Sequence, residues 1–205
     1  MIQSGQQKLT RGLKHCEGMP VFRRFTIKCF RSSPFVEQIR LLFRDQQVSY
    51  YENIIDSGNV NGLEATEINH NLPCLYDGEQ QIDKLGASMR HLGRVFDLYG
   101  SAEQMTYVDI VYEALRALQM EYEEFKQSGQ WFLINRLPEH MPFLDEQLYG
   151  KMYFLNERIS FVDYTMMEML RLLLNVDPNC LDAYPSVLQF YENMRNRPNI
   201  AAYLQ

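Results

Sequence analysis

Residues 25–30 read Phe-Thr-Ile-Lys-Cys-Phe, and this stretch, together with the residues after it, decides the class of fold. Its apolar side chains recur at every second position, which is the period of a β-strand. Ser33 and Pro34 come next, a capping residue and a first-turn proline that predict the start of a helix. The run from Val48 to Ile55 is rich in β-branched and aromatic residues and predicts a second strand. Strand, helix and strand in this order predict a β-α-β unit with parallel strands.

A β-hairpin and a helix come after this unit. Asp77 and Gly78 stand between two short extended runs, residues 72–76 and 79–82, and this dipeptide is a strong hairpin signal. Residues 84–96 then predict a helix. We therefore expect residues 23–100 to form one α/β domain.

The second half of the chain carries helical patterns. Apolar residues recur at steps of three and four from Tyr107 to Phe125, which is typical of one long amphipathic helix. Two prolines within residues 137–150 predict a broken helix with loops. Ser160, with Asp163 three positions later, predicts a capped helix start. Prolines also open two predicted terminal helices, at Pro185 and Pro198. Residues 101–205 are therefore expected to be an all-α domain.

Composition excludes several classes of protein. The chain has 205 residues, of which 46% are hydrophobic and 22% charged, as in ordinary folded proteins. No apolar run approaches the ~20 residues that cross a bilayer, and a pI near 5.3 disfavours nucleic-acid binding. The four cysteines lack metal-ligand spacing, so we expect reduced thiols, no metal site and a cytoplasmic location.

The N-terminal part is basic. Residues 1–31 hold seven of the 20 basic residues and one acid, Glu17. We expect residues 1–22 to be an N-terminal extension. Three interpretations stay open: a solvated tail, a mitochondrial-type presequence, or an extension that precedes a natural start at Met19.

The order of elements and several local motifs resemble the cytosolic glutathione S-transferases, most closely the pi class. The motifs are residues 71–73 (Asn-Leu-Pro), 90–94 (Arg-His-Leu-Gly-Arg), 98–100 (Leu-Tyr-Gly), 159–164 (Ile-Ser-Phe-Val-Asp-Tyr), 180–185 (Cys-Leu-Asp-Ala-Tyr-Pro) and 197–200 (Arg-Pro-Asn-Ile). The resemblance covers residues 22–205. It implies the glutathione S-transferase fold: an α/β thioredoxin-like N-terminal domain followed by an all-α C-terminal domain.

The resemblance also implies where glutathione would bind, and several of those positions are changed. The activating tyrosine of pi-like members falls on Cys29, and a contacting tryptophan and lysine fall near Val60 and Glu64. The pair that holds the γ-glutamyl end falls on Lys84 and Leu85, and an acid from the partner subunit falls on Ala117. Losing two charged hydrogen bonds, at about 1.5–3 kcal/mol each, would weaken binding roughly a hundredfold or more.

Other parts of the site are retained or replaced. The main chain at Leu72 and Pro73 is expected to pair with the cysteinyl part of glutathione. Ser32 resembles the activating serine of the zeta and delta classes, at the positive end of a helix. The alternative for Ser32 is that it is a loop residue beside Ser33, which caps the helix. For Cys29, two interpretations stay open: a redox cysteine, or a small buried apolar residue.

The resemblance further implies a homodimer. Arg90 and Arg94 lie four apart on one predicted helix, and Asp109 and Glu113 lie four apart on the next. In pi-like members such side chains meet across a two-fold interface. The aromatic residue that plugs into the partner falls on Asn69.

Two functions are therefore expected. The first is glutathione conjugation to small hydrophobic electrophiles with weak or altered activity, glutathione being a substrate and no cofactor being needed. The alternative is a non-catalytic dimer of the same fold that serves as a binding or scaffold protein.

Overall fold

The computed structural model describes residues 23–31, 33, 35–55 and 72–205. The predicted extension, residues 1–22, lies outside them. Five single positions that the sequence singled out also lie outside: Ser32, Pro34, Val60, Glu64 and Asn69.

A four-stranded sheet forms the first half. Its strands are β1 (Phe25–Phe30), β2 (Tyr50–Ile55), β3 (Cys74–Asp77) and β4 (Gln80–Asp83), in the order β2-β1-β3-β4. β1 and β2 are parallel, whereas β3 is antiparallel to both β1 and β4. This confirms the predicted parallel unit and the hairpin. Gly78 has a φ of +62°, a conformation that glycine adopts without steric cost.

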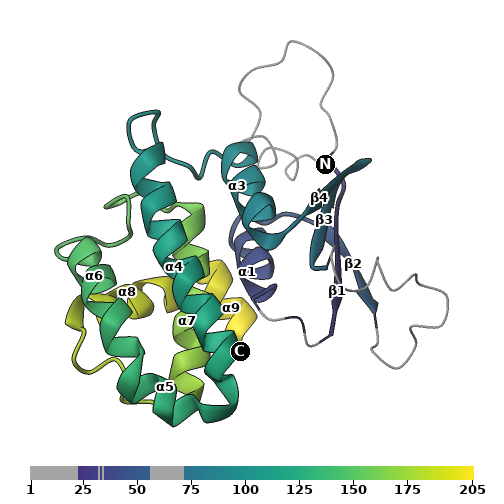
Figure 1. Cartoon of the computed structure of the whole chain (residues 1–205). Coiled ribbons are helices and arrows are strands. Elements are labelled where there is room, and N and C mark those ends of the chain that lie inside the picture. Colours follow the sequence, from purple (N-terminus) through teal and green to yellow (C-terminus); the bar gives the residue numbers. More distant parts are fainter. Residues whose placement is uncertain (1–22, 32, 34, 56–71) are drawn as a thin grey trace.

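Helices make up the rest. They are α1 (Glu37–Asp45), α3 (Leu85–Val95), α4 (Met105–Phe125), η1 (Lys126–Ser128), α5 (Gly129–Asn135), α6 (Leu137–Leu148), α7 (Phe161–Val176), α8 (Pro185–Arg195) and α9 (Pro198–Leu204). In Figure 1, α1 and α3 lie between the sheet and the helices of the second half. The C-terminal helix α9 returns to lie beside α1, the first helix of the sheet half.

The start of α1 differs from the sequence expectation. The helix begins at Glu37 rather than at Ser33 and Pro34. The Ser33 hydroxyl accepts a hydrogen bond from the Phe30 backbone N–H at 2.9 Å, so it closes a turn after β1 instead of capping the helix. Phe35 has a φ of +60°, which is incompatible with a right-handed helix and delays its start.

Residues 137–148 also differ from the expectation, because they form one continuous helix, α6. Leu137, Met141, Leu144 and Leu148 lie on one face and are all buried. Pro142 lies inside the helix on its exposed side. Burying four apolar side chains contributes more than the single backbone hydrogen bond that Pro142 removes.

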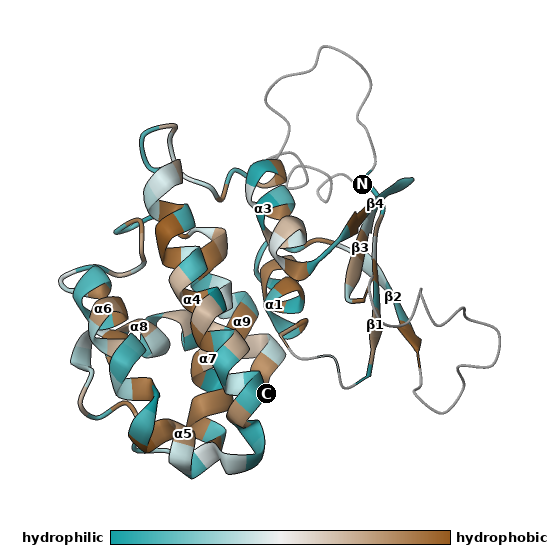
Figure 2. Ribbon diagram, viewed as in Figure 1, coloured by the Kyte–Doolittle hydropathy of each residue, from teal (hydrophilic) through white to brown (hydrophobic). Residues whose placement is uncertain are grey.

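One hydrophobic core runs through both halves. On β1 the buried side chains are Phe25, Ile27 and Cys29, which confirms the alternating pattern. Helix α7 is buried on nearly every side, since α1 packs on one side of it and α4 on another. In Figure 2, brown and teal residues alternate along the outer helices, as expected of amphipathic helices that cover a core.

The predicted cap of α7 is present. The Asp163 carboxylate accepts hydrogen bonds from the Ser160 backbone N–H and hydroxyl, both at 2.6 Å. It also accepts the Phe154 N–H at 3.0 Å. Burial of this carboxylate raises its pKa from 3.8 to about 6.

Among the helices that the structure describes, none is long and apolar enough to span a bilayer.

Candidate functional site

The register of the sheet brings three segments together at one edge. Lys28 on β1 pairs with Cys74 on β3, so the chain just before Cys74 runs alongside the end of β1. Cys74 also pairs with Asp83 on β4, and α3 begins two residues after Asp83. The end of β1, the approach to β3 and the start of α3 therefore share one edge of the sheet.

The approach to β3 contains a cis peptide bond between Leu72 and Pro73. Both residues are half-buried, and the ladder between β1 and β3 begins only at Cys74. The main chain of Leu72 therefore stands beyond the paired part of β3. Such a strand end can pair with an extended peptide through main-chain hydrogen bonds.

The start of α3 contributes main-chain groups and one cation. Leu85 is buried, so its side chain belongs to the core and only its backbone faces the edge. Lys84 precedes the helix with a φ of +68° and is exposed. Among the described residues, no N-cap side chain bonds the first turn of α3. The backbone N–H groups of this turn, with the positive end of the helix dipole, suit a carboxylate.

Cys29 lies at the end of β1 on the buried face of the sheet, with no exposed surface. Its Sγ accepts a long hydrogen bond from Arg40 Nη2 on α1, at 3.7 Å. Burial raises the pKa of the Cys29 thiol, and the Arg40 charge opposes this only in part. Cys29 is therefore a neutral thiol at pH 7.

Comparisons with known proteins identify the family of this chain. Residues 108–205 match a family model described as the glutathione S-transferase C-terminal domain. A glutathione S-transferase of Dirofilaria immitis is 35% identical over 82% of this chain and 85% of that protein. A Caenorhabditis elegans protein named glutathione S-transferase P 10 is 34% identical over 91% of both chains. The chain belongs to the glutathione S-transferase family.

A solved structure supports the same assignment. The pi-class glutathione S-transferase of Onchocerca volvulus aligns with a TM-score of 0.80 at 28% identity, covering 88% of this chain and 91% of that one. The resemblance to the pi class is thereby confirmed, together with the thioredoxin-like sheet and the helical second half. The chain is a glutathione S-transferase-like protein.

The candidate glutathione residues fall into two groups. Cys29, Leu72, Pro73, Lys84 and Leu85 come from distant parts of the sequence and share one edge of the sheet. Ser32 lies outside the described residues, so its role stays a prediction.

Within the part of the chain that the structure describes, no group of three or more His, Cys, Asp or Glu side chains is placed to hold a metal ion.

The sequence did not single out Arg40, the residue that contacts Cys29. Its guanidinium donates to Glu52 on β2 at 2.7 Å and to Glu37 at 2.9 Å. The Tyr203 hydroxyl on α9 donates to the other oxygen of Glu37 at 2.6 Å. Arg40 thus ties α1 to β2 directly and to α9 through Glu37. The spacing of Glu37 and Arg40, three apart on a predicted helix, was the available signal.

The four candidate dimer residues lie on α3 and α4, and Arg90 contacts both Asp109 and Glu113 within one chain. Arg90 Nε donates to Asp109 at 2.8 Å, and its Nη2 pairs with Glu113. Arg94 lies over the ring of Tyr99, whose hydroxyl donates to Asp109 at 2.8 Å. These residues form one partly exposed polar surface, which we call the α3–α4 face.

Proposed function

We propose that this chain binds glutathione at the edge formed by the end of β1, the cis-proline segment and the first turn of α3. Glutathione is then conjugated to small hydrophobic electrophiles, at a rate limited by the altered sulfur end of the site. The observation that carries this proposal is the register of the sheet. The pairing of Cys74 with Lys28 and with Asp83 sets the unpaired chain at Leu72 and Pro73 beside the end of β1 and the start of α3.

The peptide part of glutathione matches the groups available. Main-chain groups of Leu72 would pair with the cysteinyl unit, as an added strand pairs with a sheet edge. The γ-glutamyl carboxylate would lie at the first turn of α3, where backbone N–H groups and Lys84 supply positive charge. Since the Leu85 side chain is buried, Leu85 would act through its backbone alone.

The side chains expected near the glutathione sulfur support the expectation of weak activity. Conjugation requires the thiol proton to leave for solvent, after which the thiolate attacks the electrophilic carbon and a leaving group departs. A hydroxyl donor beside the sulfur favours the thiolate because it hydrogen-bonds the charged form. A thiol is a weaker hydrogen-bond donor than a hydroxyl, and Cys29 is also buried, so it is a poor substitute. Ser32 is the remaining candidate donor.

The roles of the two domains, the dimeric state and the cellular location are also part of this proposal. We assign glutathione binding to residues 23–100 and the electrophile pocket to the helical residues 101–205. Two chains would associate through the α3–α4 face, and the dimer would work in the cytoplasm. Replacing Ile110, which is 55% exposed on α4, by arginine should then convert a dimer into a monomer in light scattering.

Titration calorimetry with glutathione and a conjugation assay with 1-chloro-2,4-dinitrobenzene test the proposal. We expect micromolar binding and slow but measurable conjugation by the wild-type chain. Ser32→Ala should lower the conjugation rate at least about tenfold, with glutathione affinity little changed, if the serine donates to the sulfur. Ser128→Ala, at an exposed serine on η1, is the matched control and should leave both unchanged.

Two outcomes would contradict parts of the proposal. Absent or millimolar glutathione binding would overturn it and leave the non-catalytic dimer. An unchanged conjugation rate in Ser32→Ala would remove the serine from the mechanism, whatever the affinity.

A further inference from the structure

Tyr112 on α4 carries a buried hydroxyl group without a partner. The side chain has no exposed surface, and among the described residues none forms a hydrogen bond with its hydroxyl. The Tyr164 hydroxyl, which is also buried, donates to Asp45 at 2.6 Å. Leaving a polar group buried and unpaired costs free energy, so such a group in a folded protein needs an explanation. A ligand that supplies the missing partner is one explanation.

The hydroxyl lies beside Gly86, in the first turn of α3. A Cβ atom at Gly86 would lie 3.5 Å from the Tyr112 hydroxyl oxygen and 3.4 Å from Arg90 Nη1. Both are ordinary contact distances, so the position is open and a methyl group would fill it. We call this space, bounded by Gly86, Arg90 Nη1 and the Tyr112 hydroxyl, the Gly86 notch. Because glycine has no side chain, a ligand can approach the backbone closely here.

Arg90 is fixed with one corner of its guanidinium at the notch. Its Nε donates to Asp109 at 2.8 Å, its Nη2 donates to Glu113, and the guanidinium lies over the Tyr112 ring, 4.6 Å from the centroid. Within the part of the chain that the structure describes, nothing accepts a hydrogen bond from Nη1. The Arg90 side chain is 25% exposed. A ligand would therefore reach Arg90 from solvent, and a small shift of Nη1 would open the hydroxyl to it.

The charges around the notch favour an anion. Burial raises the pKa of Tyr112 to about 12, so its hydroxyl keeps the proton and can donate at pH 7. Arg116 and Arg90 together lower this pKa more than Glu113 raises it, which means that the neighbouring charges favour negative charge beside the hydroxyl. The backbone N–H groups in the first turn of α3 add the positive end of the helix dipole.

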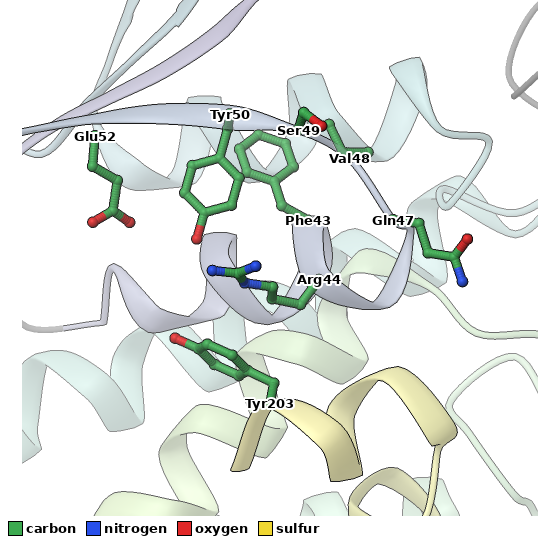
Figure 3. Close-up of a pocket in the computed structure, with 8 residues that line it drawn as sticks. All are labelled: Phe43, Arg44, Gln47, Val48, Ser49, Tyr50, Glu52 and Tyr203. Atoms are coloured by element: carbon green, nitrogen blue, oxygen red, sulfur yellow. The ribbon is translucent and has the colours of Figure 1, made fainter. Parts of the chain in front are cut away.

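The notch belongs to the glutathione edge of the sheet. Gly86 follows Leu85 directly, and α3 packs on β3 and β4. The larger hollow shown in Figure 3, of about 560 Å³, lies between α1, β2 and α9, at the other end of the strand order. Tyr50 and Tyr203 are among the residues that line it. A ligand at the notch is therefore distinct from one in that hollow, and Tyr50 offers a control position.

We propose that Arg90 Nη1 and the Tyr112 hydroxyl bind the α-carboxylate of the γ-glutamyl unit of glutathione at the Gly86 notch. This inference rests on the proposed function, because it completes the γ-glutamyl end of the same site. One carboxylate oxygen would accept hydrogen bonds from the first turn of α3, and the other from Arg90 and Tyr112. Since the Leu85 side chain is buried and cannot donate a hydrogen bond, donors from α3 and α4 would supply the contact expected at that position.

Titration calorimetry with glutathione on two variants of the full chain tests this site. Tyr112→Phe should weaken binding at least about tenfold, because a hydrogen bond to a charged group is lost. Gly86→Ala should weaken binding to a similar extent, because its methyl group fills the notch. Tyr50→Phe, in the hollow of Figure 3, is the matched control and should bind glutathione as the wild type does.

Urea unfolding separates ligand binding from a structural role. Tyr112→Phe removes a hydroxyl that has no partner among the described residues, so it should be at least as stable as the wild type. Gly86→Ala should raise the urea midpoint, because alanine favours a helix over glycine. A residue with only a structural role would instead lose stability on substitution. The expected signature is therefore weaker binding by a chain of equal or greater stability.

Two analogues of glutathione identify the group that is bound. Wild type and Tyr112→Phe should bind γ-aminobutyryl-cysteinylglycine equally, since this analogue lacks the α-carboxylate. The difference between the two proteins should persist with glutaryl-cysteinylglycine, which keeps that carboxylate and lacks the ammonium group. An equal loss with both analogues would overturn the assignment to the carboxylate.

The remaining outcomes are decisive as well. Unchanged glutathione affinity in Tyr112→Phe or Gly86→Ala would overturn this inference and leave the proposed function standing. A change from dimer to monomer in Tyr112→Phe, measured by light scattering, would also overturn it, because the hydroxyl would then serve the contact between subunits. If the wild-type chain fails to bind glutathione, the proposed function and this inference fall together.

Discussion

Single buried side chains decide much of the chemistry of this chain, and Cys29 is the first example. The family resemblance predicts that it lies nearest the glutathione sulfur, and burial keeps its thiol neutral. Since the thiolate is the reactive form, we expect iodoacetamide at pH 8 to modify Cys29 far more slowly in the native protein than in urea. Mass spectrometry of the digested protein measures this. Rapid native modification of Cys29 would mean that it is a reactive cysteine after all.

Glu168 on α7 makes stability depend on pH. Burial raises its pKa from 4.5 to about 7, although Arg171 lies 3.2 Å away. Between these values the folded state holds a proton that the unfolded state has lost, so the free energy of unfolding falls as pH rises. Glu168→Gln removes this contribution. We expect the stability of wild type, relative to this variant, to fall by about 1–3 kcal/mol between pH 5 and pH 8.

Urea unfolding at several pH values measures whether the stability of wild type, relative to Glu168→Gln, falls as pH rises. Groups shared by the two proteins, including Asp163, cancel in the difference. Glu146→Gln, at an exposed position on α6, is the control and should track the wild type. A difference that does not fall as pH rises would show that this carboxylate is already charged in the folded protein at pH 5.

At this scale, local motifs predicted some site residues and could not predict others. Leu72 and Pro73 could be named as candidate site residues because a short motif carries them. Arg40 was missed because its role depends on hydrogen bonds to Glu52 and Cys29. Those bonds form only when α1 packs on the sheet. Glu37 and Tyr203 are 166 positions apart in the sequence, and no local pattern links them.

At the scale of elements, burial overrides local breakers. Pro142 lies inside α6 and removes the hydrogen bond to the carbonyl of Pro138. Pro142→Ala restores that bond at an exposed position, with a partly offsetting gain of freedom in the unfolded chain. We expect a net stabilisation of about 1–2 kcal/mol in urea unfolding. Pro138→Ala, in the first turn where no N–H partner exists, should give no such gain. Equal gains from both would refute this account of α6.

Element identity was largely predictable, whereas element ends were not. The β1 alternation, the Asp77-Gly78 turn and the Ser160 cap are local signals with local causes, and all three are present. The start of α1 shifted because the Ser33 hydroxyl closes a turn with Phe30. A serine before a proline fits either role, and only the path of the chain after β1 decides between them.

At the scale of the whole molecule, one buried carboxylate joins the sheet half to the helical half. Asp45, at the end of α1, accepts hydrogen bonds from the Tyr164 hydroxyl at 2.6 Å and from Arg197 at 2.9 and 2.7 Å. Its side chain is 2% exposed. The sequence identified residues 197–200 only as a family motif. In the structure, Arg197 and Asn199 both bind Asp45, which fixes α9 against α1.

Asp45→Asn should therefore destabilise the whole chain. The substitution leaves Arg197 without its carboxylate and weakens the acceptor of Tyr164, and breaking such a pair costs about 3–5 kcal/mol. The surface pair of Asp97 and Arg158, with side chains 84% and 47% exposed, is the matched control. Asp97→Asn should cost at most about 1 kcal/mol. Urea unfolding followed by the fluorescence of Trp131, the single tryptophan, measures both. Equal losses from the two substitutions would show that the contact between the halves rests on apolar packing and not on Asp45.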